Sequence, residues 1–213
     1  MGEEKSVAAT KTFSAQIFLS LLLVQALGGE IEANDLGKKL ASELAEIGRA
    51  TDGIAEDFIA VQECFVLARS ISSAIAFECG LKLQETCYIR ARAYHSSDFY
   101  HGPMAMVSDG IKVILFASKH SLHREYDGVH RADCRQCAEK MLELGAELYI
   151  VTDDAESYKD QPAHFVALPE ADNEYLAVFR FALFTQMLAC KVSCGKELDP
   201  DSPRALKKVT VTK

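Results

Sequence analysis

The stretch CFVLARSISSAIAFECGLKLQETCYIRARAY, residues 64–94, carries the pattern from which the fold can be predicted. Residues 64–69 form a short, almost continuously apolar run that is typical of a buried strand. Residues 70–87 begin with several serines and continue with helical spacing of apolar residues, and residues 88–94 return to a strand pattern. A helix between two strands favours parallel pairing, because a parallel pair needs a long crossover connection.

The same alternation of strands and helices continues toward the C-terminus. Further strands are predicted over residues 111–118, 146–154 and 164–170, helices over 121–144 and 174–192, and a short helix or structured loop over 96–107. Strands as apolar as residues 113–116 indicate a sheet that is covered on both faces. We therefore predict an α/β fold with a doubly wound, flavodoxin-like parallel sheet and helices on both faces.

Two helices are predicted before the first strand, over residues 10–27 and 34–50. The apolar run of residues 17–29 is too short to span a membrane. It also lacks the basic start and the cleavage pattern of a signal peptide, so we interpret it as part of a buried helix. Residues 196–213 are polar and lack hydrophobic periodicity, which predicts an extended C-terminal tail.

Composition limits the classes of partner. The chain has 213 residues, of which 49% are hydrophobic, enough for one good core. Its formal net charge of -8 argues against nucleic-acid and membrane-surface partners, which need a basic footprint. The 7 cysteines lie mostly in apolar or helical stretches, which suits the reducing cytoplasm. Cys134 and Cys137 form a single CxxC within the helix predicted over 121–144, so ordinary helix residues are favoured over a metal site.

The helix predicted over residues 70–87 carries a charged stripe. Glu78, Lys82 and Glu85 fall within about 60° of one another around a helix. One interpretation is a solvated face held by weak ion pairs. The other is a functional site, since this helix follows the first strand and ligands of open parallel sheets gather at the carboxyl ends of strands.

His101 is the second candidate feature, because the glycine and proline that follow it restrict its backbone. An imidazole that titrates near neutrality is suited to moving protons at the ring oxygen of a sugar. A carboxylate such as Glu85 could move a proton beside a carbonyl. The residues alone leave a packing or surface role for His101 open.

Several motifs resemble those of one family. AFECGLKLQE, RARA and HGP occur in that order between residues 76 and 103, SVAATKTFSAQ covers residues 6–16, and DPDSPRALKKVTVTK covers residues 199–213. Together they resemble the sugar isomerase (SIS) domain family, and specifically the second SIS domain of two-domain phosphosugar isomerases and amino-sugar-phosphate deaminases. The resemblance implies a sugar phosphate substrate and proton-transfer chemistry without a metal or cofactor.

The resemblance also implies catalytic roles. Glu85 matches the base that moves a proton between the first two carbons of the open-chain sugar. His101 matches the residue that opens the sugar ring, which in the family reaches into the site of a neighbouring subunit, so a homodimer with shared active sites is expected. Lys208 matches the lysine of the C-terminal tail, although counting backward from VTVT selects Lys207 instead.

Further positions match the substrate-binding part of the family motifs. Val7 and Ala8 match backbone positions that line the sugar site. Glu78 and Lys82 match the rest of the charged stripe, and Lys207 stays an alternative contact of the tail.

The resemblance divides the chain into residues 1–55 as the closing helices of an otherwise missing first SIS domain, residues 56–195 as an SIS domain and residues 196–213 as an active-site tail. The family's Ser-x-Ser-Gly-(Glu/Asp)-Thr phosphate loop does not occur in this sequence. The expected function is isomerisation of a hexose or aminohexose 6-phosphate, with or without ammonia release or transfer, by a fragment that lacks its phosphate-binding domain. The alternatives are a non-catalytic sugar-phosphate sensor and an inactive partner subunit.

Overall fold

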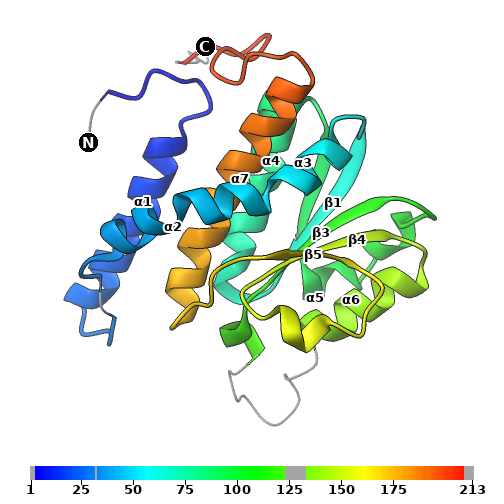
Figure 1. Ribbon diagram of the computed structural model, residues 1–213, viewed down its shortest axis with the longest axis horizontal. Helices are drawn as coiled ribbons and strands as arrows, with labels where there is room; N and C mark the ends of the chain where they lie inside the picture. Colours follow the sequence, from blue (N-terminus) through cyan, green and yellow to red (C-terminus); the bar gives the residue numbers. More distant parts are fainter. Residues whose placement is uncertain (1–2, 32, 123–132, 209–213) are drawn as a thin grey trace.

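The computed structural model describes residues 3–31, 33–122 and 133–208. Within these ranges, five strands form one parallel sheet in the order β2-β1-β3-β4-β5 (Figure 1). The strands are β1 (Glu63–Ala68), β2 (Arg90–His95), β3 (Lys112–Ala117), β4 (Glu147–Thr152) and β5 (His164–Ala167). This order is that of the flavodoxin-like doubly wound sheets, so the predicted fold class is confirmed.

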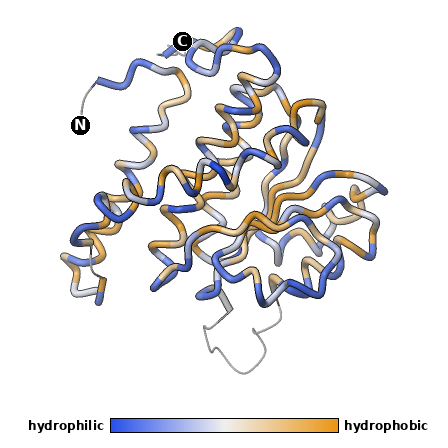
Figure 2. Tube along the Cα trace, viewed as in Figure 1, coloured by the Kyte–Doolittle hydropathy of each residue, from blue (hydrophilic) through white to orange (hydrophobic). Residues whose placement is uncertain are grey.

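Helices cover both faces of the sheet. The described α-helices are α1 (Thr10–Ala26), α2 (Leu36–Ala50), α3 (Asp52–Phe58), α4 (Ser73–Cys87), α5 (Ser96–Phe99), α6 (Asp133–Glu143) and α7 (Glu174–Gly195). Alternate residues of β1 point to opposite faces: Val66 packs in the core beneath α4 and α7, and Phe65 packs in the core with α5 and α6. Figure 2 shows hydrophobic residues concentrated along the central strands between these two layers.

The structure corrects two details of the predicted elements. In the described part of the chain three helices, not two, precede β1, because a short helix, α3, buries Ile54, Ala55 and Phe58 against the core. Seven residues hold too few turns to show a clear helical period, which explains why the sequence pattern missed α3. The helix predicted over 121–144 lies partly outside the described residues. Its described parts are a 3₁₀ turn (Lys119–Leu122) and the α-helix α6.

The first helix differs from its prediction in another way. We interpreted it as buried, but Leu21 is its only buried residue, and Leu19, Leu23 and Leu27 are 63%, 60% and 79% exposed. Its sequence is apolar on all sides, a composition usually found in helices that are covered all round. The α1 residues that pack, such as Phe13, Ile17 and Leu21, do so in clusters with residues of α2 and α7.

Among the described residues, α7 alone is long and apolar enough to cross a membrane. Most of it is buried, however, because 72% of its most apolar window lies inside the protein. The helix packs against α2, α3 and α4, so its composition is explained by its place in the core.

A buried ion pair fixes the N-terminal helices to this core. Arg180 on α7 is 2% exposed and donates hydrogen bonds from Nε and Nη2 to the two carboxylate oxygens of Glu43 on α2, at 2.7 and 2.6 Å. Its Nη1 atom donates to the carbonyl oxygen of Pro169 at 3.0 Å. Such a two-pronged contact sets both the distance and the angle between α2 and α7.

Candidate functional site

The motif-bearing segments meet at a pocket of about 390 Å³. It lies between α4, the C-terminal half of α7, the segment before α1 and the C-terminal tail. Figure 1 shows that the segment before α1 and the tail after α7 lie on the same side of the molecule. The described lining residues are Ser6, Ala8, Thr10, Leu44, Lys82, Thr86, Leu183, Gln186, Met187, Ala189, Cys190, Pro200 and Asp201.

The charged stripe of α4 is buried beside this pocket. Glu78 and Lys82 are 7% and 5% exposed, and the Lys82 ammonium lies 3.4 Å from Glu78 Oε1 and 2.9 Å from Glu85 Oε2. Burial raises the pKa of the Glu78 carboxyl, the nearby Glu85 charge adds to the effect, and Lys82 opposes it. With two of its three charges buried and Glu85 25% exposed, the stripe does not fit the interpretation of a solvated face.

The charged row does not lie at the carboxyl ends of the strands, where we expected a ligand site. Glu85 lies near the C-terminal end of α4, next to Gln84, whose Nε2 atom donates to the carbonyl oxygen of Ala91 at the start of β2. A crossover helix runs back along its strands, so its C-terminal end lies at their amino ends. The stripe is therefore at the edge of the sheet opposite to the one that the general rule for α/β proteins selects.

The N-terminal segment and the tail hold each other at the pocket. The backbone N–H of Val7 donates to the carbonyl oxygen of Asp201 at 3.3 Å. Both tail lysines are exposed, and the Lys208 ammonium donates to the carbonyl oxygen of Ser6 at 2.7 Å. Both contacts join residues from opposite ends of the chain, and of the two candidate lysines it is Lys208 that reaches a lining residue.

Ala8 is 5% exposed and lines the pocket, whereas Val7 is present at the site through its backbone contact to the tail. Glu85 is not a lining residue itself but is joined to the pocket through Lys82, and its side chain is 25% exposed. Glu78 lies deeper, on the far side of Lys82. Apart from Lys207, the predicted binding residues line this pocket or contact residues that line it, and Lys82 lies at the centre of the charged part.

His101 lies elsewhere in this chain. It follows α5, whose Phe99 ring packs 5.2 Å from that of Phe65 on the face of the sheet away from α4. The backbone N–H of His101 donates to the carbonyl oxygen of Asp98 at 3.1 Å, and its side chain is exposed. The sheet thus separates His101 from the Glu85 of the same chain.

Sequence reasoning missed the lining residues of α7. Gln186 and Cys190 are spaced by one helical turn and face the pocket, and Gln186 Nε2 donates to the carbonyl oxygen of Thr10 and to Ser14 Oγ, at 3.3 and 2.9 Å. A polar residue every fourth position within an apolar helix was the available signal. The long apolar stretches around these residues concealed it.

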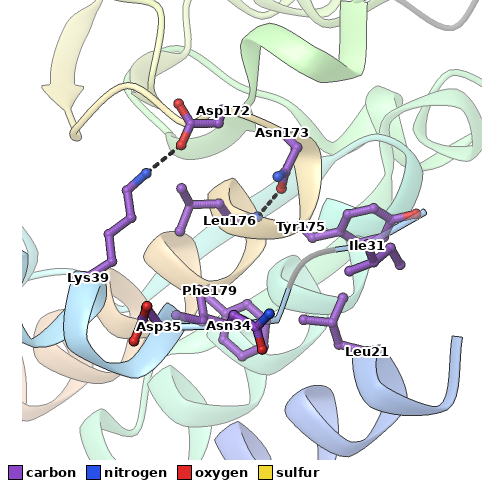
Figure 3. A pocket seen from close by; sticks show the side chains of 11 residues that line it. Leu21, Ile31, Asn34, Asp35, Lys39, Asp172, Asn173, Tyr175, Leu176 and Phe179 are labelled. Atoms are coloured by element: carbon purple, nitrogen blue, oxygen red, sulfur yellow. Dashed lines mark hydrogen bonds and ion pairs between the residues drawn. The ribbon is translucent and has the colours of Figure 1, made fainter. Parts of the chain in front are cut away.

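A second pocket, of about 280 Å³, lies at the other end of α7 (Figure 3). Three of its polar residues are already engaged: Lys39 pairs with Asp172, and Asn173 Oδ1 accepts a hydrogen bond from the N–H of Leu176. None of the residues predicted for the site lines it. We therefore place the candidate site at the larger pocket.

Within the described part of the chain, no group of three or more His, Cys, Asp or Glu side chains is placed to hold a metal. Cys134 and Cys137 are buried in the core formed with α6. The histidines at positions 123 and 130 lie outside the described residues.

Known proteins resemble this chain in sequence. The family model for the SIS domain matches residues 58–194. The isomerizing glutamine–fructose-6-phosphate aminotransferase of Haemophilus influenzae is 31% identical over 224 residues, which cover 99% of this chain and 35% of that protein. The corresponding protein of Legionella pneumophila (strain Lens) is 29% identical over 218 residues, which cover 99% and 34%. This chain thus spans about a third of the length of the curated relatives it matches.

Two solved structures share the fold. The C-terminal domain of glucosamine-fructose-6-phosphate aminotransferase from Francisella tularensis has a TM-score of 0.78 at 23% identity, covering 94% of this chain and 58% of that chain. Glucosamine-6-phosphate deaminase from Thermotoga maritima has a TM-score of 0.73 at 20% identity, covering 99% and 60%.

Proposed function

The chain belongs to the SIS domain family, and from this premise we propose that it is the isomerase portion of a protein acting on a hexose or aminohexose 6-phosphate. The proposed reaction is aldose–ketose isomerisation of the open-chain sugar, with or without release or transfer of ammonia. The observation that carries the proposal is the row of buried Glu78 and Lys82 and partly exposed Glu85, beside a pocket lined by the segment before α1 and by the C-terminal tail. The names of the relatives, two aminotransferases and a deaminase of sugar phosphates, support the substrate class.

Glu85 is the proposed base. It is the most exposed carboxylate of the row, and the hydrogen bond from Lys82 holds it in place. Glu85 takes the proton from carbon 2 of the open-chain aldose and returns it to carbon 1, while the hydroxyl proton of oxygen 2 is exchanged for one on oxygen 1. Lys208, held against Ser6, stabilises the negative charge that develops on the sugar oxygens.

The phosphate group needs additional donors. Lys82 is the cation among the described lining residues, and it is already paired with two carboxylates, while Asp201 adds a negative charge. A phosphate bound by these residues alone would be weakly held. We therefore propose that residues 1–55 belong to a first SIS domain whose remaining part, carrying the phosphate-binding loop, completes the site, with residues 56–195 as the second domain and 196–213 as its tail.

His101 is proposed to act in the site of a second subunit, because the sheet separates it from the Glu85 of its own chain. Mixing His101→Ala subunits with Glu85→Gln subunits, each inactive alone, is expected to restore about a quarter of wild-type turnover, since half of randomly mixed two-fold dimers carry one intact site of two. The measurement is interconversion of fructose 6-phosphate and glucose 6-phosphate after mixing, with a first SIS domain supplied to wild-type and variant subunits alike. Mixed dimers that form, as shown by native mass spectrometry, yet remain inactive would count against shared sites.

Alkylation of Cys190 tests binding at the pocket directly. Burial raises the pKa of the Cys190 thiol and the neighbouring Cys194 adds to this, so the reaction with iodoacetamide is run at mildly alkaline pH. Saturating fructose 6-phosphate is expected to slow labelling of Cys190 severalfold, because Cys190 lines the pocket. Cys194, exposed one turn further along α7 but not a lining residue, is the internal control.

Peptide mass spectrometry reports both rates in one sample. Equal protection of the two cysteines, or none, would contradict binding at this pocket. Protection of Cys190 without any turnover by the wild-type chain supplied with a first SIS domain would instead favour a sugar-phosphate sensor.

A further inference from the structure

Tyr88 joins the helix of the proposed base to the C-terminal tail. It ends α4 in the left-handed conformation, with φ 56°, shortly after Glu85. Its hydroxyl oxygen accepts a hydrogen bond from the backbone N–H of Arg204 at 2.8 Å. The Arg204 guanidinium carbon also lies 4.1 Å from the centroid of the Tyr88 ring, a cation–π contact. One aromatic side chain thus contacts both the backbone and the side chain of a single tail residue.

These contacts lie between the two other points at which the tail is attached. Asp201 accepts from the N–H of Val7, and Lys208 donates to Ser6. Without an attachment at Arg204, the segment between Asp201 and Lys208 could extend to roughly 23 Å, long enough to carry the lysine well away from Ser6. The attachment at Arg204 therefore limits where the Lys208 ammonium can lie.

We propose that Tyr88 and Arg204 are positioning residues that clamp the tail to the end of α4 and so hold Lys208 at the pocket. The role of Lys208 in turnover rests on the proposed function, whereas the clamp itself does not. The clamp also connects two proposed catalytic groups, because Tyr88 follows Glu85 on the same helix and Arg204 precedes Lys208 in the same tail. Any shift of the end of α4 is transmitted to the lysine.

The position of the clamp outside the core makes it testable without unfolding the protein. Tyr88 is only half-buried and Arg204 is exposed, so substitutions at either residue are expected to leave the fold intact. Tyr88→Phe keeps the ring and removes only the hydroxyl acceptor. Arg204→Ala removes the cation over the ring, and Arg204→Lys restores a cation there.

The experiment measures acetylation of single lysines by an N-hydroxysuccinimide ester in this chain, read by peptide mass spectrometry. In the wild-type protein both lysines are exposed, but the Lys208 ammonium is bound to Ser6, so Lys208 is expected to react more slowly than Lys207, its internal control. Tyr88→Phe and Arg204→Ala are each expected to raise the Lys208 rate toward that of Lys207. Arg204→Lys is expected to return the rate most of the way to the wild-type value.

Two outcomes separate this proposal from the proposed function. An unchanged Lys208 rate in both Tyr88→Phe and Arg204→Ala overturns the clamp, even if the protein turns over sugar phosphates. A raised Lys208 rate, together with no turnover of any sugar phosphate even when a first SIS domain is supplied, supports the clamp and rejects the isomerase function. If Tyr88→Phe lowers the thermal midpoint, the exposed Arg204 variants decide the result.

Discussion

Replacing Glu85 with glutamine is expected to lower sugar-phosphate turnover by about 10²- to 10⁴-fold, the usual contribution of a positioned general base. Glutamine has nearly the same size as glutamate, and its amide oxygen can still accept the hydrogen bond that Lys82 donates to Glu85 at 2.9 Å. The substitution therefore removes the ability to accept a proton and little else. The measurement is interconversion of fructose 6-phosphate and glucose 6-phosphate, together with ammonia release from glucosamine 6-phosphate.

The matched control is Glu143→Gln. Glu143 lies at the end of α6, pairs with Lys140 at 2.9 Å and is 65% exposed, so it has the same chemistry away from the pocket. This control is expected to keep full turnover. If Glu85→Gln stays within a few-fold of the wild-type rate while substrate binding is unchanged, Glu85 is not the base.

The assay is run on this chain and on the chain supplied with a first SIS domain. Little turnover is expected from this chain alone, because Lys82 is the cation among the described lining residues and is already paired. Turnover that appears only when the first domain is supplied indicates a missing phosphate site. No turnover in either sample indicates a missing base.

The fold could be predicted from the sequence because its strands are short, apolar and separated by helical patterns. Periodicity of this kind reports which residues are buried, and β1, β3 and β4 are each buried along nearly their whole length. The short helix α3 could not be predicted in this way. The exposure of Leu23 on α1 was also hidden, since an apolar helix looks the same in sequence whether or not something covers it.

The site was predictable only in part, for a related reason. The spacing of Glu78, Lys82 and Glu85 places them on one side of α4 whether that side faces solvent or the interior. Their burial depends on the tail and on α7, which are distant in sequence. Likewise, the constrained backbone of His101 is visible in the sequence, whereas its position on the opposite face of the sheet follows only from how α5 packs.

Replacing Glu43 with leucine is expected to lower the free energy of unfolding by about 3–5 kcal/mol. The substitution leaves the Arg180 guanidinium, which is 2% exposed, without its carboxylate partner in a site closed to water. Only the contact from Nη1 to the carbonyl oxygen of Pro169 would remain. Urea unfolding measures the change, and Glu46→Leu, at an exposed position of the same helix, is expected to alter stability by less than about 0.5 kcal/mol.

A double variant, Glu43→Leu with Arg180→Met, distinguishes the cost of an unpaired charge from the value of the pair. Replacing a buried ion pair by apolar residues of similar volume is often close to neutral, because neither charge then has to be desolvated. We therefore expect the double variant to recover most of the stability lost in Glu43→Leu. If it stays as unstable as the single variant, the pair itself, through its fixed two-pronged geometry, holds α2 against α7, and residues 1–55 depend on it for their place beside the pocket.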